Sequence, residues 1–232
     1  MKHGISFLLV IIFSSISIAK AEKKSFSPEL RIGPSFGINL SQVSFSPSIS
    51  QNFALKYNGG ITVRYISESY FGLQGELNYS MRGWQRNFPD EAIDAGKEYT
   101  RSLNYLEIPL MSHIYFGKKV VRGFINLGPK IGFLLSEKEQ YNFSITTDED
   151  KSRFNEIGKV TEKKFDWGLC GGAGMEIHTK AGSFILEGRY YFGLGNIFNS
   201  RKADPFSKSA FSTISVNFVY LIPIRLSPKT VQ

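Results

Sequence analysis

The sequence predicts an all-β fold, an eight-stranded antiparallel up-and-down transmembrane β-barrel. Three observations predict it. Eight stretches alternate apolar residues with polar, charged or glycine residues, a period of two that fits a strand lying between two unlike environments. Short and long connections alternate between these stretches. An apolar N-terminal segment of the kind that directs export precedes all of them.

The eight stretches can be read in chain order. The first is the clearest, because residues 30, 32, 34, 36, 38 and 40 are all apolar, whereas the residues between them are Arg, Gly, Ser, Gly and Asn. The other stretches repeat this alternation, and most reach the roughly nine to eleven residues that a strand needs to cross a membrane. We expect strands at Leu30–Leu40, Leu55–Ile66, Tyr70–Arg82, Leu103–Phe116, Val120–Leu135, Phe165–Ile177, Ser183–Leu194 and Phe211–Ile224.

The connections between these strands alternate in length. The short ones are Ser67–Ser69, Gly117–Lys119 and a turn around Lys180–Gly182. The long ones are Ser41–Ala54, Gly83–Ser102, Ser136–Lys164 and Gly195–Ala210. Bacterial outer-membrane barrels have short periplasmic turns and long extracellular loops. The pattern therefore predicts an outer-membrane protein with both termini in the periplasm.

The two faces of the strands differ in charge and size. One face, which includes Ile61, Leu77 and Trp167, carries no charged residue, while the opposite face carries the acidic and basic residues among many glycines. A secreted lipocalin-like ligand-binding barrel would show the same alternation with the apolar face inside. Glycines such as Gly60 and Gly172 suit a crowded lumen, and aromatic residues near the strand ends suit membrane interfaces. We expect the apolar face to contact lipid and keep the lipocalin-like barrel as the alternative.

The first 21 residues read as a secretory signal. Lys2 and His3 give a basic start, an apolar run of 14 residues spans Ile5–Ile18, and Ala19-Lys20-Ala21 matches a cleavage pattern. The run is shorter than the roughly 20 residues of a spanning helix. We therefore expect residues 1–21 to be removed and residues 22–232 to form one barrel domain, with 225–232 as a short periplasmic tail.

Charge and cysteine content exclude other classes. The chain has 28 basic and 20 acidic residues, and removal of the signal leaves 26 basic residues against the same 20 acidic ones. These charges are spread over strands and loops without a basic stripe, so we expect no nucleic-acid partner. Cys170 is the single cysteine, so no disulfide can form within the chain.

A barrel of eight strands has an interior that side chains just fill, which argues against a wide pore. Opposite charges in such a lumen must pair, because an isolated buried charge costs several kcal/mol. We expect a lumen ion-pair network, although the sequence assigns no individual partners. Its members are Arg31, Arg64, Glu76, Glu107, Arg122, Glu187 and Arg189.

The polar residues of the strands suggest two catalytic sets, and both have a structural alternative. Glu76, Glu107 and Glu187 could serve acid/base chemistry, but neighbouring arginines favour ion pairing. Cys170 with His113 or His178 has no spacing that specifies a thiol nucleophile. We expect no catalytic residue.

Binding motifs are equally weak. The glycine-rich run 168–174 lacks the Lys-Ser/Thr ending of a phosphate loop, and Asp148–Asp150 lacks the spaced ligands of a calcium loop. We expect no metal and no cofactor. Pro109 and Pro129 lie inside expected strands and cannot donate ladder hydrogen bonds, so we expect bulges or broken pairing there.

Four runs together resemble the PorT-like outer-membrane β-barrel family of Bacteroidota. They are YLEIPL at 105–110, NLGPKIGFLL at 126–135, GGAGME at 171–176 and EGRY at 187–190. The resemblance covers nearly the whole mature chain and implies a barrel of the OmpA or OmpX type. It also implies an association with protein secretion across the outer membrane, since the namesake is associated with the type IX secretion and gliding machinery.

The sequence therefore predicts a non-enzymatic integral outer-membrane protein that acts as a scaffold or interaction protein. Its expected partners are outer-membrane lipid and other proteins, which it would contact through the extracellular loops or the periplasmic side. The alternatives are an outer-membrane enzyme, a narrow channel, and the secreted lipocalin-like barrel.

Overall fold

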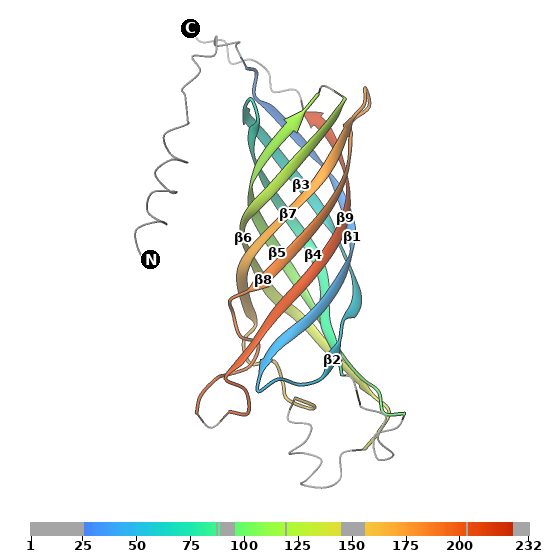
Figure 1. Ribbon diagram of the computed structural model, residues 1–232, viewed down its shortest axis with the longest axis vertical. Helices are drawn as coiled ribbons and strands as arrows, with labels where there is room; N and C mark the ends of the chain where they lie inside the picture. The colour runs from blue at the N-terminus through green and yellow to red at the C-terminus, as the bar shows by residue number, and fades with distance from the viewer. Residues whose placement is uncertain are drawn as a thin grey trace, which may run out of the picture.

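The computed structural model describes residues 26–86, 88, 96–118, 120–144, 156–202 and 204–224. Within these ranges eight long strands form one closed antiparallel ring (Figure 1). Each strand pairs with its neighbours along the chain, and β1 pairs with β9 to close the ring. The strands are β1 (Glu29–Ser46), β3 (Ala54–Glu68), β4 (Phe71–Arg86), β5 (Tyr99–Gly117), β6 (Val121–Tyr141), β7 (Phe165–His178), β8 (Ser183–Gly193) and β9 (Lys208–Ile224). The predicted eight-stranded up-and-down barrel is confirmed.

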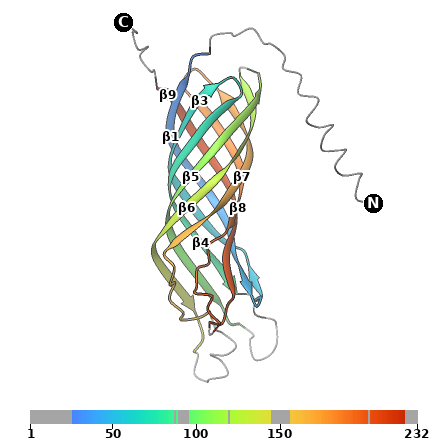
Figure 2. The ribbon, with the colours of Figure 1, turned by 90° about the vertical axis from the view of Figure 1, so that its left-hand side faces the viewer.

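The two ends of the barrel differ, as the connection lengths predict. The turns β3–β4, β5–β6 and β7–β8 lie at one end, together with the start of β1 and the end of β9, and the long connections lie at the other (Figures 1 and 2). We call these the turn end and the loop end. No helix among the described residues is long and apolar enough to cross a membrane.

The outer surface is apolar and the lumen is polar. Leu77, Trp167 and Phe218 point outward and are about half exposed, whereas Arg64 and Glu187 point inward and are buried. At outward positions of the described strands the charged residues are Lys138 and Lys208 near the loop end and Glu68 beside the β3–β4 turn. A lipocalin-like barrel needs the reverse arrangement, so that alternative is wrong.

The strands are longer at the loop end than the sequence pattern predicts. The first strand was expected to end at Leu40 but continues to Ser46, and the strand expected to end at Leu135 continues to Tyr141. The outward residues of these extensions are polar, so the apolar alternation that marks a membrane strand stops although the ladder continues. The lipid-facing band therefore ends near Leu106 and Phe133.

Smaller differences occur at strand ends. Tyr70 was expected to begin a strand but lies in the β3–β4 turn. Its φ of 76° is a left-handed backbone conformation that residues other than glycine rarely adopt. Val120 and Leu194 were expected at the ends of strands but lie just outside β6 and β8. A two-residue strand, β2 (Gln51–Asn52), pairs with the end of β4 and was not expected from the sequence.

Three ladders are interrupted where prolines lie, and the β1–β9 ladder skips from Ile32↔Ile222 to Ser35↔Val219, across Pro34. The β4–β5 ladder skips from Gly75↔Leu110 to Asn78↔Glu107, across Pro109, and the β5–β6 ladder skips from Pro109↔Lys130 to Ser112↔Leu127, across Pro129. The register is the same on both sides of each gap. The expected broken pairing at the prolines is confirmed, and its cause is the missing backbone N–H.

Candidate functional site

The lumen holds three layers of ion pairs, and the first lies at the turn end. Glu176 Oε1 accepts a hydrogen bond of 2.9 Å from Arg31 Nη1, and its Oε2 accepts one of 2.9 Å from Arg64 Nη1. Arg31 also donates to Glu29 at 2.6 Å. Glu176 and Arg64 are almost completely buried, so each charge is neutralised where water has little access.

The second layer lies at mid-height. Arg189 donates through Nη1 and Nη2 to both oxygens of Glu76, at 2.8 and 2.7 Å, and through Nε and Nη2 to Glu187, at 3.2 and 2.9 Å. Gln74 and Asn78 donate further hydrogen bonds to Glu76. One guanidinium therefore holds two buried carboxylates from strands on opposite sides of the ring.

The third layer lies toward the loop end. Arg82 Nη1 donates to Asp166 Oδ2 at 2.8 Å, and Arg82 Nε lies 2.9 Å from Glu107 Oε1. Lys130 donates to the other oxygen of Glu107 at 2.9 Å. The Arg82 guanidinium also lies 4.1 Å from the centre of the Tyr105 ring, so the layer is packed as well as paired.

The structure places six of the seven residues of the expected network in ion pairs; the seventh is Arg122. Arg122 forms no ion pair with a described residue and lies over the Tyr115 ring at 4.8 Å. Four further residues belong to the network: Arg82, Lys130, Asp166 and Glu176. Their positions on the charged face were visible in the sequence, but their pairing depends on strand register.

Aromatic side chains close the lumen at the loop end. Phe45 lies 5.4 Å from Trp84 and 4.8 Å from Phe206 between ring centres, and Phe198 lies 6.4 Å from Trp84. Phe198 and Phe206 come from the connection between β8 and β9, which therefore folds its aromatic residues onto the barrel. All four rings are buried. We call these four residues the mouth cluster.

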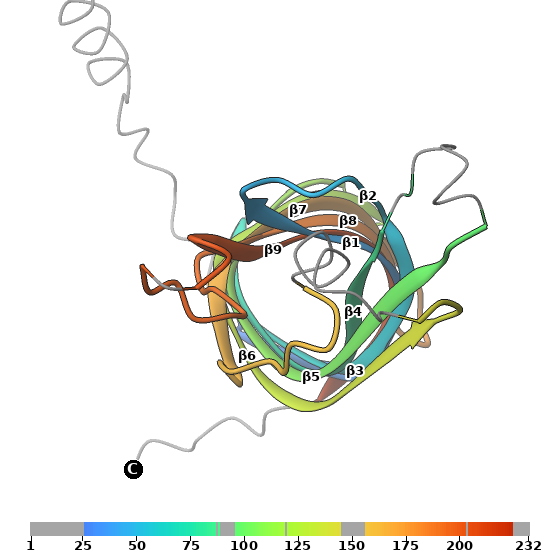
Figure 3. The same ribbon diagram turned by 90° about the horizontal axis from the view of Figure 1, so that it is seen from below.

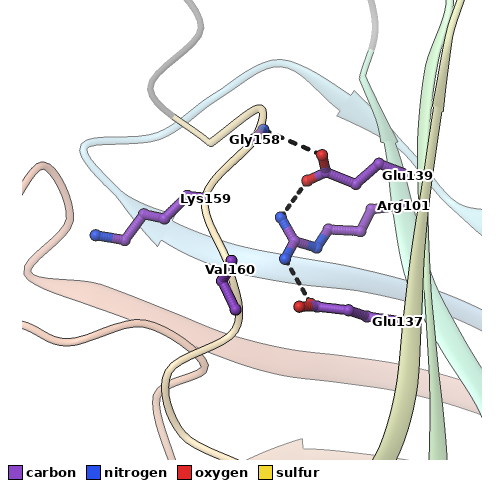
Figure 4. Close-up of a pocket in the computed structure, with 6 residues that line it drawn as sticks. All are labelled: Arg101, Glu137, Glu139, Gly158, Lys159 and Val160. Atoms are coloured by element: carbon purple, nitrogen blue, oxygen red, sulfur yellow. Dashed lines mark hydrogen bonds and ion pairs between the residues drawn. The ribbon is translucent and has the colours of Figure 1, made fainter.

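The connection between β6 and β7 also contributes to the mouth. Its described part, residues 156–164, crosses the opening when the barrel is seen from the loop end (Figure 3). Arg101 of β5 lies between Glu137 and Glu139 of β6 and faces this segment (Figure 4). Glu139 accepts a hydrogen bond of 3.1 Å from the backbone of Gly158.

A cavity of about 190 Å³ lies here, lined by Arg101, Glu137, Glu139, Gly158, Lys159 and Val160. Burial raises the pKa of Glu137, but hydrogen bonds from Thr161 and Arg101 outweigh it and leave that pKa below its usual range. In the lining, Arg101 is paired with Glu137 and Glu139, and Lys159 lies 3.6 Å from Asp204 outside the cavity. The cavity therefore lies in the contact between the β5–β6 hairpin and segment 156–164, and it offers no free charge to a ligand.

One edge of the β5–β6 hairpin pairs with no described strand beyond Phe133. β6 pairs with β7 only as far as Phe133↔Phe165, whereas its pairing with β5 continues to Tyr99↔Tyr141. Asn142 donates its backbone N–H to Glu98, so alternation along an antiparallel ladder directs the backbone groups of Glu137, Glu139 and Tyr141 to the other edge. Among the described residues no backbone group pairs with that edge.

The histidines and the cysteine do not assemble a nucleophile. His178 Nδ1 lies 2.9 Å from Ser183 Oγ, but Arg31 Nη1 lies at the same distance from that nitrogen and 2.8 Å from the hydroxyl. His178 Nε2 also lies 3.6 Å from Glu176, whose Oε1 is paired with Arg31, so Ser183 and His178 belong to the ion-pair layer at the turn end. Cys170 contacts the carbonyl of Gly128 at 3.4 Å, and Nδ1 of His113 bonds to Asn126.

The glycine-rich run and the acidic run were the two candidate binding motifs of the sequence. Residues 168–174 lie inside β7, so the glycine-rich run is part of a strand and not a phosphate-binding loop. Asp148–Asp150, the expected signal at 1–21 and the tail 225–232 lie outside the described residues. No group of three or more metal-binding side chains occurs in the described part of the chain.

A closed ring with an apolar exterior and a charged, filled lumen defines an integral outer-membrane β-barrel protein. The chain belongs to the family described as outer membrane protein beta-barrel domain, whose model matches residues 21–199. The loop end is thus extracellular and the turn end periplasmic. A search of curated proteins finds no significant match.

Solved structures of outer-membrane proteins are similar to this chain. Ail of Yersinia pestis is 14% identical, with a TM-score of 0.38 over 84% of this chain and 99% of that one. OprG of Pseudomonas aeruginosa is 13% identical, with a TM-score of 0.46 over 84% and 95%. AlkL is 10% identical, with a TM-score of 0.41 over 88% and 94%.

Proposed function

We propose that this protein is a non-enzymatic interaction protein of the outer membrane and that the β5–β6 hairpin is its recognition element. The observation that carries the proposal is the unpaired edge of β6 beyond the lipid-facing band. Free N–H and C=O groups of a strand edge bind an extended segment of another protein as an added strand. The geometry therefore favours a protein partner that presents such a segment outside the cell.

The hairpin is held in a fixed position. Arg101 joins Glu137 to Thr161 by hydrogen bonds of 2.6 and 3.2 Å, which anchors the inner face of the hairpin to the segment across the mouth. The outward side chains of this part of β6 are Ser136, Lys138 and Gln140, all exposed. A rigid edge loses less conformational entropy on binding than a flexible loop does.

The filled lumen supports the same proposal over a channel. Three layers of ion pairs and the mouth cluster occupy the path between the two ends. Ions would have to separate buried pairs, each of which is costly to break. An enzymatic role has less support, because Arg31 Nη1 lies 2.9 Å from the same nitrogen of His178 that contacts Ser183.

A proline substitution tests the proposal. Tyr141→Pro removes one N–H from the free edge and leaves the ladder to β5 in place, whereas Tyr141→Ala removes the same side chain and keeps the N–H. Cross-linking on intact cells with a photoreactive residue at position 140 should yield one specific protein adduct. The adduct should persist in Tyr141→Ala and disappear in Tyr141→Pro. Equal yields in both variants, or recovery of bulk porins alone, would contradict the proposal.

A PorT-like role in protein secretion remains a prediction of the sequence resemblance. Deletion of the gene should then lower the amount of secreted cargo in the medium. Unchanged secretion in the deletion strain would reject that role and leave the interaction function standing.

A further inference from the structure

Four lysines lie on one side of the barrel at the extracellular rim. They are Lys138 of β6, Lys163 and Lys164 before β7, and Lys208 at the start of β9. All four are exposed, and the described residues give none of their ammonium groups an ion pair. Because β6, β7, β8 and β9 are neighbours in the ring, these lysines form one arc, which we call the lysine arc.

Aromatic rings lie directly below the arc, at the edge of the lipid-facing band. Phe133 and Phe165 pack at 5.4 Å between ring centres, and both are nearly half exposed. Lys164 immediately precedes Phe165, and the ammonium of Lys208 lies 5.9 Å from the Phe192 ring. The arc therefore begins at the edge of the lipid-facing band, where headgroups meet acyl chains, and Lys138 lies farthest from that edge.

On the opposite side, the outward positions of the described strand ends carry no lysine. Outward residues at the extracellular ends of the other four strands are uncharged, namely Gln42, Ser44, Leu55, Gln85, Thr100 and Ser102. Lys56 lies between two outward residues and faces the lumen. A general need for solubility would distribute lysines around the whole rim, so the arc marks one side of the barrel for an anionic partner.

Nearby acidic residues do not neutralise the arc. Glu162 accepts a hydrogen bond of 2.6 Å from the backbone of Asn199 and lies 3.9 Å from Lys159. Asp204 lies 3.6 Å from the same lysine and accepts from the backbone of Arg201. Both carboxylates are directed to the loops, which leaves the four arc ammonium groups available.

We propose that the lysine arc binds a phosphorylated glycolipid of the outer leaflet, with its phosphates on the lysines and its acyl chains on the aromatic residues below. Charge complementarity and the continuity with the lipid-facing band support this occupant over a soluble anion, which would make no use of the exposed rings. The inference is independent of the recognition role of the β6 edge. It adds an oriented lipid contact that involves one side of the barrel only.

The test uses the full-length folded protein in detergent and bisphosphorylated lipid A as the probe, with the bound fraction measured by native mass spectrometry. The variant K138Q/K163Q/K164Q/K208Q should bind on the order of several hundredfold more weakly, because each lysine near anionic lipid contributes roughly fivefold in affinity and four are removed. The matched control K118Q/K180Q removes exposed lysines from the periplasmic turns and should bind as the unaltered protein does. Heat-modifiable migration checks that each variant is folded.

Three results would overturn the proposal. Equal binding by the arc variant and the unaltered protein would remove the role of the lysines. Equal binding of phosphatidylglycerol would show general attraction to anionic lipid. Displacement of lipid A by inorganic phosphate at equal concentration would show a soluble-anion site. Weaker binding of monophosphorylated lipid A, with no effect of inorganic phosphate, is the outcome that supports the proposal.

Discussion

Removal of the Arg189 guanidinium tests the energetic importance of the lumen network. Arg189→Met keeps most of the side-chain volume but leaves Glu76 and Glu187 buried without their cation. Both carboxylates are almost inaccessible, with exposed fractions of 6% and 0%. They keep only amide donors, Gln74 and Asn78 for Glu76 and Asn126 for Glu187.

The magnitude follows from the contacts of Arg189. Its four charge-assisted hydrogen bonds would each contribute about 1.5–3 kcal/mol. The variant no longer has to remove a guanidinium from water, and this saving offsets several kcal/mol of the lost hydrogen-bond energy. Breaking a buried pair by removing one partner costs about 3–5 kcal/mol net in proteins, and we expect a loss in this range.

Urea titration of the protein folded in lipid vesicles measures this loss, with heat-modifiable migration as the readout. The triple variant Arg189→Met, Glu76→Gln, Glu187→Gln should recover most of the stability, because neutral amides replace the unpaired charges. Arg122→Met is the matched control and should cost less than about 1 kcal/mol, since Arg122 has only its contact with Tyr115. A loss below about 1 kcal/mol in Arg189→Met, or no recovery in the triple variant, would refute the reasoning.

Three further predictions follow from the same geometry. Gly128→Ala should prevent folding, because a Cβ there would lie 2.0 Å from the carbonyl oxygen of Leu110, whereas Gly188→Ala, with open space around the Cβ position, should fold normally in the same migration assay. Protonation of Glu137 should release segment 156–164. Because the pKa of Glu137 is lowered in the folded protein, its stabilisation of the segment is complete above the usual pKa of about 4.3 and is lost as the pH falls through the folded-state value. At pH 6 the segment should be better protected from hydrogen exchange in the unaltered protein than in Glu137→Gln, and this difference should shrink as the pH is lowered. Purified protein in planar bilayers should show no stable ion conductance, and steady single-channel steps would contradict the filled lumen.

Much of the fold follows from local pattern. A strand between lipid and a polar lumen needs an apolar residue at every second position, so Leu73, Leu77 and their counterparts mark strands without reference to the rest of the chain. The pattern stops where the outward residues become polar. For that reason the extension of β6 from Ser136 to Tyr141 was assigned to a loop, and the hairpin that carries the proposed recognition edge was missed.

The lumen network was also predictable only in part from the sequence. The sequence by itself determined which face carries the charges and that they must pair, because the lumen of an eight-stranded barrel excludes most water. Only the tertiary structure decided the partners, such as Arg82 with Asp166, which are far apart in the chain, and it left Arg122 beside an aromatic ring. The closure of the mouth by Phe198 and Phe206 was decided in the same way. The physical reason is that alternation is a property of each strand alone, whereas register and loop packing depend on the whole closed ring.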